Sequence, residues 1–391
     1  MQVLQNLNTA KKLINSTFGA PSLEINGSEG SAVTPGLVDG QDYSAWLEDA
    51  GIDPTGIELT APARISRWQV YDETWRTAYK FSFRVLNGPE LDLPLLYSQA
   101  KKTKPPKPLT KKLTDKALVI LWSDLQVGKV ASRGGTAELL QRVSDTRARI
   151  IANVKQERPS RIVFCDVGDL IEGFSSTADM HQLATNDLSI MSQIDVSTTI
   201  MWDTLKALSE HCDDIAYLTV GSNHCQWRVN KQKIGTGHDD WGVHVGRTLA
   251  RLSQEVGLPI KFYEPNEWDE SLVHDVFGDN FHRLGLFHGH QAARPDGIPG
   301  WISKQMLGNQ AISGATLYAT GHFHHLQVRE VGNTERNTSR YWVQAKTMDS
   351  GSDWYRNSGG MGDSDCGVVC IPLEKGKERS EEHTSELQSP S

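Results

Sequence analysis

GHFHH, residues 321–325, is the stretch from which the fold of the whole chain can be inferred. It follows the apolar run ATLYAT, residues 315–320, so we expect a buried strand to end there and a loop to begin. His322 and His324 stand two residues apart beside Gly321, which lets the backbone approach a bound group closely. Because neutral histidine is the commonest nitrogen ligand of divalent cations, the stretch indicates a metal site.

Polar side chains also follow four strands that we predict upstream of this stretch. In open α/β sheets, functional groups collect at the carboxyl ends of the strands. The residues that stand at these ends are Asp124 and Gln126, Asp169, Asn223 with His224, and His288. Carboxylate, amide and imidazole groups without thiolates favour Mn²⁺, Fe or Zn²⁺ at a reactive site over a structural zinc.

Apolar strands alternate with helical stretches from Lys116 onward, which is typical of an α/β domain. The patterns predict helices over residues 136–157, 187–211 and 238–257. They predict strands over residues 117–123, 161–169, 215–224, 271–277, 281–287, 315–320, 341–345 and 367–373.

The motifs in this order resemble the calcineurin-like metallophosphoesterase superfamily, over about residues 116–373. They are SDLQ, GDLIE, GSNH, HGH and GHFHH. The resemblance implies a four-layer α/β/β/α sandwich and two divalent cations, with Mn²⁺ as the expected metal and Fe or Zn²⁺ as alternatives. It implies that the first cation is held by Asp124, Gln126, Asp169 and His324. It implies that the second is held by Asn223, His288 and His322, with the Asp169 carboxylate bridging both.

Two departures from the family pattern concern these ligands. Gln126 stands where the family usually has histidine, so the first cation is expected to bind more weakly. Ser222 is inserted between the glycine and the Asn-His pair, and Cys225 replaces the usual acidic residue. The pair itself is intact, so both of its roles are retained.

The resemblance further implies phosphoester hydrolysis between two cations about 3.5–4 Å apart. A hydroxide that bridges them attacks phosphorus, and His224 donates a proton to the leaving oxygen. Such general-acid catalysis contributes roughly 10²–10⁴-fold in rate. Asp169 and His224 are thus the expected catalytic residues, whereas Glu172 is expected to orient its loop.

The loop QWRVNKQKIGTG, residues 226–237, suggests a nucleic-acid phosphodiester as substrate, because its cations could grip phosphates and its tryptophan could stack on a base. The expected substrate contacts are Trp227, Arg228, Lys231, Lys233, Lys129, Arg133 and His290. The arrangement resembles phage-encoded members of the superfamily and, remotely, its double-strand-break-repair nucleases. The net charge of −8 argues against a tight general DNA binder. Two alternatives stay open, a nucleotide or small-molecule phosphohydrolase and a catalytically weak scaffold or binding protein on the same fold.

The 391 residues divide by composition into several parts. We expect a flexible lead-in over 1–41, a small α+β domain over 42–98, a Lys/Pro-rich linker over 99–115, the α/β domain over 116–373 and a tail over 374–391. The linker stretch KKTKPPKPLTKK, residues 101–112, is either a solvated spacer or a basic strap for a phosphate backbone. Residues 379–391 resemble the translation of a sequencing-library adapter and are expected to be non-native.

No apolar run approaches the roughly 20 residues of a membrane span, and the N-terminal stretch lacks the apolar core of a signal peptide. A cytoplasmic protein with no membrane partner is therefore expected, in the host cytoplasm if it is phage-encoded. The protein partners are not indicated by the sequence.

Overall fold

The computed structural model describes residues 22–26, 29–34, 37–38, 57–60, 62–69, 73–85, 113–173, 186–229, 232–351, 365–377 and 385–388. The chain divides into two compact units, Met1–Glu90 and Leu91–Ser391. Each unit is described by itself.

The first unit is a sheet built around the long strand β6, Trp75–Val85. Phe81 and Phe83 are buried, as expected for the apolar positions of a strand with period two. The remaining strands are β1 (Ser22–Asn26), β2 (Glu29–Val33), β3 (Leu37–Val38), β4 (Ile57–Leu59) and β5 (Arg64–Gln69). The lysine-rich stretch 101–112 lies outside the described residues.

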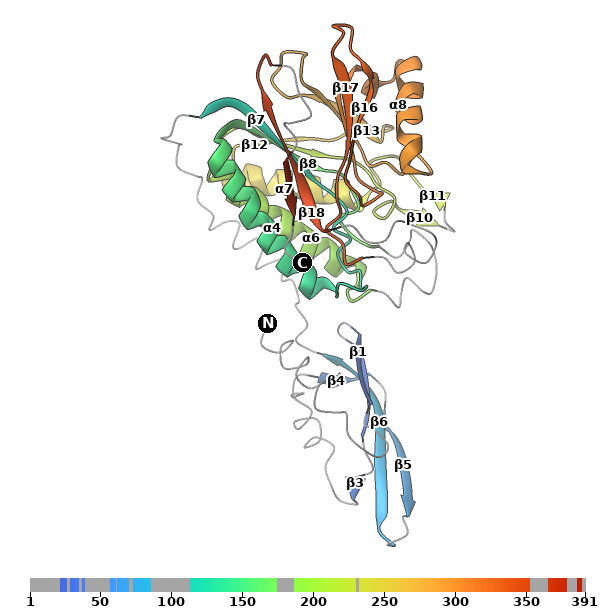
Figure 1. The fold of residues 1–391 in the computed structure, drawn as a ribbon. Helices are drawn as coiled ribbons and strands as arrows, with labels where there is room; N and C mark the ends of the chain where they lie inside the picture. The colour runs from blue at the N-terminus through green and yellow to red at the C-terminus, as the bar shows by residue number, and fades with distance from the viewer. Residues whose placement is uncertain are drawn as a thin grey trace. The chain divides into compact units, whose positions relative to one another are not determined.

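The second unit begins with a mainly parallel sheet of order β12-β9-β8-β7-β18-β19. Its strands are β7 (Thr114–Trp122), β8 (Pro159–Asp166), β9 (Ile215–Thr219), β12 (Ile260–Tyr263), β18 (Gly367–Glu374) and β19 (Ser385–Gln388). The helices that follow its parallel strands are α4 (Thr136–Glu157), α6 (Ile190–Ser209) and α7 (Trp241–Val256). Figure 1 shows these three helices together on one side of the sheet.

A row of aromatic rings runs across four neighbouring strands of this sheet. Trp122 lies 5.7 Å from Phe164, Phe164 lies 5.8 Å from Tyr217, and Tyr217 lies 5.1 Å from Phe262, measured between ring centroids. These rings belong to the apolar core that the sheet shares with its helices. Because side chains alternate between the two faces of a strand, the row fixes which residues face the opposite way.

A second sheet, of order β13-β14-β15-β17-β16, packs against that opposite face. Val119, Val163 and Leu218 from the first sheet share one buried core with Leu286 and Val343 from the second. The strands of the second sheet are β13 (Ser271–Asp275), β14 (Arg283–Phe287), β15 (Leu317–Thr320), β16 (Gln327–Asn333) and β17 (Ser339–Gln344).

Helix α8, Ile298–Leu307, belongs to a third apolar core with residues of the second sheet (Figure 1). Trp301 of this helix stacks on Phe287 with ring centroids 4.4 Å apart. The mixed α/β class is therefore confirmed. In the second unit, the sequence did not predict β12, β16, α8, β19 or the short hairpin of β10 (Arg228–Val229) and β11 (Gln232–Lys233).

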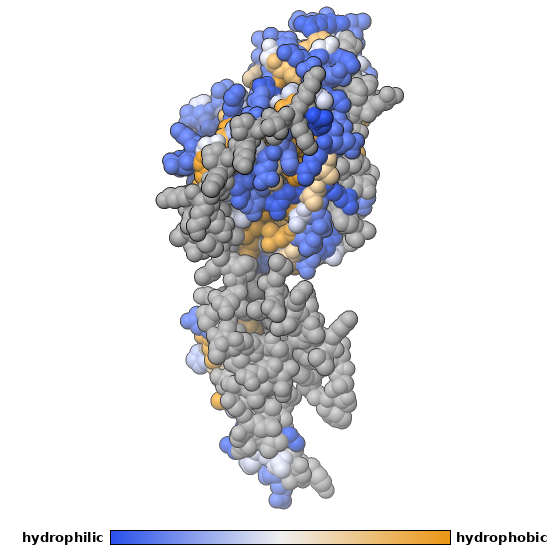
Figure 2. All heavy atoms as spheres, turned by 90° about the vertical axis from the view of Figure 1, so that its left-hand side faces the viewer, coloured by the Kyte–Doolittle hydropathy of each residue, from blue (hydrophilic) through white to orange (hydrophobic). Residues whose placement is uncertain are grey.

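The edge strand β19 pairs antiparallel with β18 and lies within the stretch suspected to be non-native. No helix in the described parts of the chain is both long enough and apolar enough to traverse a bilayer. On the face shown in Figure 2 the coloured surface of the second unit is mainly hydrophilic, with apolar atoms in separate patches.

Candidate metal centre

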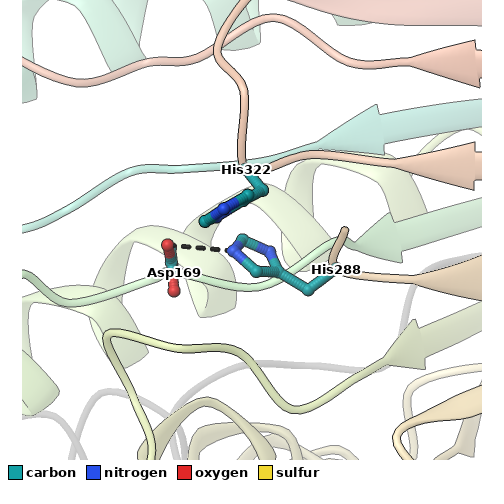
Figure 3. A group of neighbouring side chains, drawn as sticks. All are labelled: Asp169, His288 and His322. Carbon is teal, nitrogen blue, oxygen red and sulfur yellow. Dashed lines mark ion pairs between the residues drawn. The ribbon is translucent and has the colours of Figure 1, made fainter. Parts of the chain in front are cut away.

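Three predicted ligands from different strand ends come together in the second unit (Figure 3). Asp169 follows β8, His288 follows β14 and His322 follows β15, so both sheets contribute. One ligand atom of each lies within 4.8 Å of the others. Asp169 and His288 are fully or almost fully buried. The ends of these strands thus bring together residues that are far apart in the sequence, as we expected from the positions of the polar residues.

The His288 ring is oriented so that one nitrogen faces two oxygens. Its Nδ1 donates to the Val167 carbonyl at 2.7 Å, so in the neutral ring Nε2 carries the lone pair. Nε2 lies 3.0 Å from Asp169 Oδ2 and 3.0 Å from Asn223 Oδ1. Three electron-rich atoms that converge at such distances need a positive charge between them, either a proton or a cation. The donor set, one carboxylate, one amide oxygen and imidazoles, fits a divalent metal ion.

The charges of the site hold two of these groups in the form that binds metal. Burial raises the pKa of Asp169, but the neighbouring His288 and His224 outweigh it and bring the pKa well below its usual value. Burial and the His288 charge lower the pKa of His322 to about 3, so this ring is neutral at pH 7. Burial lowers the pKa of His288, but the Asp169 charge raises it to about 9. A cation bound at Nε2 would therefore have to displace a proton from His288.

Three other predicted ligands, Asp124, Gln126 and His324, form a second group, which we call the Asp124 group. Asp124 Oδ1 lies 3.2 Å from His324 Nε2, and Asp124 Oδ2 accepts the His322 backbone N–H at 3.0 Å. The Asp124 side chain is fully buried and also accepts from the Ser123 hydroxyl. Gln126, in contrast, directs its Oε1 toward Lys129 Nζ at 2.6 Å. Within the described residues, the compact group of potential metal donors contains Asp169, His288 and His322 but none of the Asp124 group.

Asp349 adjoins the Asp124 group but was missed by the sequence argument. Its Oδ2 lies 2.7 Å from Lys129 Nζ and 3.4 Å from His324 Nδ1. The side chain is buried, and burial raises its pKa, but Lys129 and His324 bring the pKa well below the usual value. Asp349 follows β17 closely, so the rule applied to the other strand ends could have found it.

Five of the predicted ligands have a left-handed backbone. The φ angles are 52° at Asp124, 44° at Gln126, 52° at Asp169, 69° at His322 and 63° at His324. They account for half of the ten non-glycine residues with positive φ in the described chain. Such a conformation costs on the order of 1–3 kcal/mol per residue and is concentrated at functional sites. The strain sets this group apart from ordinary polar loops.

Gly321 and Gly168 allow the loops to approach each other. A Cβ atom at Gly321 would lie 2.6 Å from Asp124 Oδ2, so the backbone passes close to this carboxylate. A Cβ atom at Gly168 would lie 2.6 Å from the Ser222 Cβ and 2.7 Å from His288 Nδ1. A side chain at either position would push ligands apart.

The inserted Ser222 connects the Asp169 loop to helix α7. Its hydroxyl accepts the Asp169 N–H at 2.8 Å, while its own N–H donates to Asp240 Oδ2 at 2.9 Å. Asp240 also caps α7 by accepting the N–H groups of Gly242 and Val243. Burial raises the pKa of Asp240 to about 7. The departure from the family pattern thus has a structural use, because it fixes the backbone of a ligand.

His224 lies beside the centre and is held by Glu172. Its backbone N–H donates to Asp169 Oδ1 at 2.9 Å. The ring donates from Nδ1 to the Glu172 carbonyl at 2.8 Å, and the Glu172 carboxylate lies 3.4 Å from the same nitrogen. This contact leaves Nε2 as the atom that can exchange a proton.

The expected substrate contacts have varied surroundings. Lys233 is paired with Glu270, and His290 Nε2 lies 3.3 Å from the same carboxylate. Trp227 is 52% exposed and packs edge-on against Trp241. Arg228 donates to Gln226 and Arg133 to Cys366, while Lys231 lies outside the described residues.

No family model and no curated protein matches this chain. Two solved structures show a weak likeness. The first is a Staphylococcus aureus protein described as "Putative 5'-Nucleotidase", with 11% identity, a TM-score of 0.26 and coverage of 70% of this chain and 53% of that one. The second is GAP50, described as the anchor in the inner membrane complex of Plasmodium, with 11% identity, a TM-score of 0.29 and coverage of 71% and 90%. The chain spans about half the length of the first. At these TM-scores neither likeness bears on the function.

Proposed function

We propose that the protein is a metal-dependent phosphoesterase of the calcineurin-like type that hydrolyses phosphodiesters. The proposal includes the four-layer α/β/β/α sandwich and the domain boundaries at 116 and 373. The observation that carries it is the convergence of one ligand atom each of Asp169, His288 and His322 within 4.8 Å, from strand ends of two different sheets. The 3.0 Å contact between His288 Nε2 and Asn223 Oδ1 adds a fourth donor of the expected type.

Two groups of ligands would hold two divalent cations. Asn223, His288 and His322 would hold one, and Asp124, Gln126 and His324 would hold the other, with Asp169 shared between them. Mn²⁺ is the expected metal, and Fe or Zn²⁺ also suits these oxygen and nitrogen donors. When bound, such cations lower the pKa of a coordinated water toward neutrality and neutralise phosphate oxygens.

His224 would donate the proton that the leaving oxygen needs. The Glu172 carbonyl at 2.8 Å fixes the ring through Nδ1, so Nε2 is the atom available for transfer. Asp169 holds the backbone of the same residue through its Oδ1 at 2.9 Å. This hydrogen bond fixes the position of the proton donor, His224, relative to the proposed ligand Asp169.

A nucleic-acid substrate is supported by the exposed Trp227, three residues after His224, which can stack on an unpaired base. The second candidate is a nucleotide or small-molecule phosphohydrolase. It is favoured by Lys233, whose charge is balanced by Glu270 and is less available to a phosphate backbone. We propose the phosphodiester of a nucleic acid as the substrate and keep the smaller esters as the alternative.

The test is hydrolysis by the purified protein with added Mn²⁺. The substrates are single-stranded DNA, duplex DNA, RNA, cyclic nucleotides, mononucleotides and bis-p-nitrophenyl phosphate. Release of labelled mononucleotides from a strand supports a nuclease, whereas turnover of nucleotides alone supports the second candidate. The matched control is Asp169→Asn, which keeps the shape of a ligand but removes its charge. A folded, Mn²⁺-loaded protein that leaves every ester intact would favour the scaffold on the same fold.

A further inference from the structure

Lys129 is turned back toward the metal centre by a tight turn over residues 126–129. The Lys129 N–H donates to the Gln126 carbonyl at 3.1 Å, and Gly128 has a φ of 97°. A bond from the first to the fourth residue with glycine at positive φ in third position is typical of a type II turn. The sequence QVGK thus places the ammonium group beside the side chain of Gln126.

The ammonium group of Lys129 forms hydrogen bonds with oxygen atoms that a cation in the Asp124 group would need as ligands or neighbours. It donates to Gln126 Oε1 at 2.6 Å and to Asp349 Oδ2 at 2.7 Å. Asp349 Oδ2 in turn lies 3.4 Å from His324 Nδ1. The Lys129 side chain is only 12% exposed, so it lies inside the centre and not at its rim.

The two groups of ligands therefore differ in how available their donor atoms are to a metal ion. Asp169, His288 and His322 direct donor atoms toward one another within 4.8 Å. In the Asp124 group, the donor oxygen of Gln126 already accepts a bond from a positive charge. An amide oxygen that accepts from an ammonium group has one lone pair left, but a metal ion bound there would lie close to the ammonium charge, and the repulsion between the two cations weakens its binding.

The charges around the centre lead to the same result. The buried carboxylates of Asp124, Asp169, Glu172 and Asp349 carry four negative charges. Lys129 and one divalent cation balance three of them. A second divalent cation would leave an excess of one positive charge in a buried site, which is unfavourable until an anion arrives.

We infer that the Lys129 ammonium takes the place of the cation in the Asp124 group, so that the resting centre binds one divalent ion tightly and accepts a second only when Lys129 withdraws. A phosphodiester substrate supplies negative charge and is the natural trigger for this second binding. The inference rests on the proposed phosphoesterase function, and it concerns how the same site is loaded. It replaces the expectation that Lys129 acts as a contact for the substrate.

The experiment is a Mn²⁺ titration of the substrate-free protein, followed by calorimetry and by metal analysis after gel filtration. The wild type is expected to retain one Mn²⁺ per chain. In Lys129→Met a second Mn²⁺ should bind at least about tenfold more tightly, because a neighbouring positive charge is removed. Lys129→Gln keeps a donor for Asp349 and should change in the same direction. Lys129→Arg keeps the charge and should behave like the wild type.

Lys116→Met is the control for loss of a lysine charge elsewhere. Lys116 is paired with Glu157 at 2.8 Å on the outer part of β7 and should leave the titration unchanged. Circular dichroism confirms that each variant is folded before it is titrated. Because Lys129→Gln can still donate to Asp349, it tests the inference even if Lys129→Met does not fold.

The outcomes separate the inference from the proposed function. Two Mn²⁺ ions bound tightly by the wild type, with no change in either neutral variant, would overturn the inference while the hydrolase stands. A raised KM for nucleic acid in Lys129→Met with unaltered metal binding would also overturn it, since Lys129 would then contact the substrate. Absence of Mn²⁺ binding in all folded proteins, together with no hydrolysis of bis-p-nitrophenyl phosphate, would refute the proposed function itself.

Discussion

Gly168→Ala is expected to weaken metal binding, because the new methyl group meets the residues that hold two of the predicted ligands. The new Cβ would lie 2.6 Å from the Ser222 Cβ and 2.7 Å from His288 Nδ1. Ser222 accepts the Asp169 N–H, and His288 Nδ1 donates to Val167, so the methyl group disturbs both hydrogen bonds. Because each bond orients a metal ligand, the affinity for Mn²⁺ should fall about 10- to 100-fold.

The loss of stability has two parts that can be worked out from the structure. Gly168 has a φ of 99°, and an alanine in that conformation costs about 1–2 kcal/mol. Forcing a methyl group into a packed site costs about 1–3 kcal/mol more. The free energy of unfolding of the metal-free protein should therefore decrease by about 2–5 kcal/mol.

Gly332→Ala is the matched control. Gly332 has a φ of 125°, and a Cβ added there meets no atom within 4 Å. It should carry only the backbone part of the cost, about 1–2 kcal/mol, with Mn²⁺ affinity unchanged. Urea denaturation in the presence of chelator measures the stabilities, and calorimetry measures the Mn²⁺ affinities. Equal behaviour of the two variants in both assays would refute the packing that we describe around Gly168.

Three further predictions concern single residues. His224→Ala should keep its metal but lose about 10²–10⁴-fold in kcat on esters with poor leaving groups, and far less on p-nitrophenyl esters; equal losses on both would contradict the role of proton donor. Gln126→His should bind the weaker Mn²⁺ about tenfold more tightly, since an imidazole is the better ligand; an unchanged titration would show that position 126 does not coordinate. Burial raises the pKa of Asp240 from 3.8 to about 7, so the folded chain keeps a proton that the unfolded chain loses. The resulting contribution to stability is full below pH 3.8 and disappears as the pH rises to about 7. The stability of Asp240→Asn relative to the wild type, both free of metal, should therefore increase between pH 4 and 7 by about 1.4 kcal/mol per pH unit at most; a constant difference would mean that Asp240 titrates normally.

The elements that could be predicted from the sequence are those with strong periodicity. The helix predicted over 136–157 has these bounds, and the apolar strand predicted over 117–123 is confirmed as β7. In contrast, β12 and β16 are short or polar edge strands with a half-exposed pattern. Their side chains carry little of the apolar signal on which periodicity depends.

The candidate site was predictable as far as strand ends reveal it. The convergence of Asp169, His288 and His322 follows from polar residues at the carboxyl ends of β8 in the first sheet and of the parallel strands β14 and β15 in the second. The inward direction of Lys129 did not follow from the sequence, because a lysine beside a motif also suits a solvated rim. That direction depends on the turn at Gly128 and on Asp349, which is far away in the sequence and was not considered.

Because the predicted ligands come from two separate sheets, metal binding should also affect how firmly these sheets are held together. Asp169 follows a strand of the first sheet, and His288 and His322 follow strands of the second, so a bound ion would be a non-covalent cross-link between the two sheets. Because only the assembled sandwich presents all three groups, occupancy at 100 times the dissociation constant adds about 2.7 kcal/mol to the cohesion of the layers. Removal of the metal in the cell would thus lower the free energy of unfolding of the second unit and increase its cleavage by proteases, in addition to abolishing any chemistry at the centre.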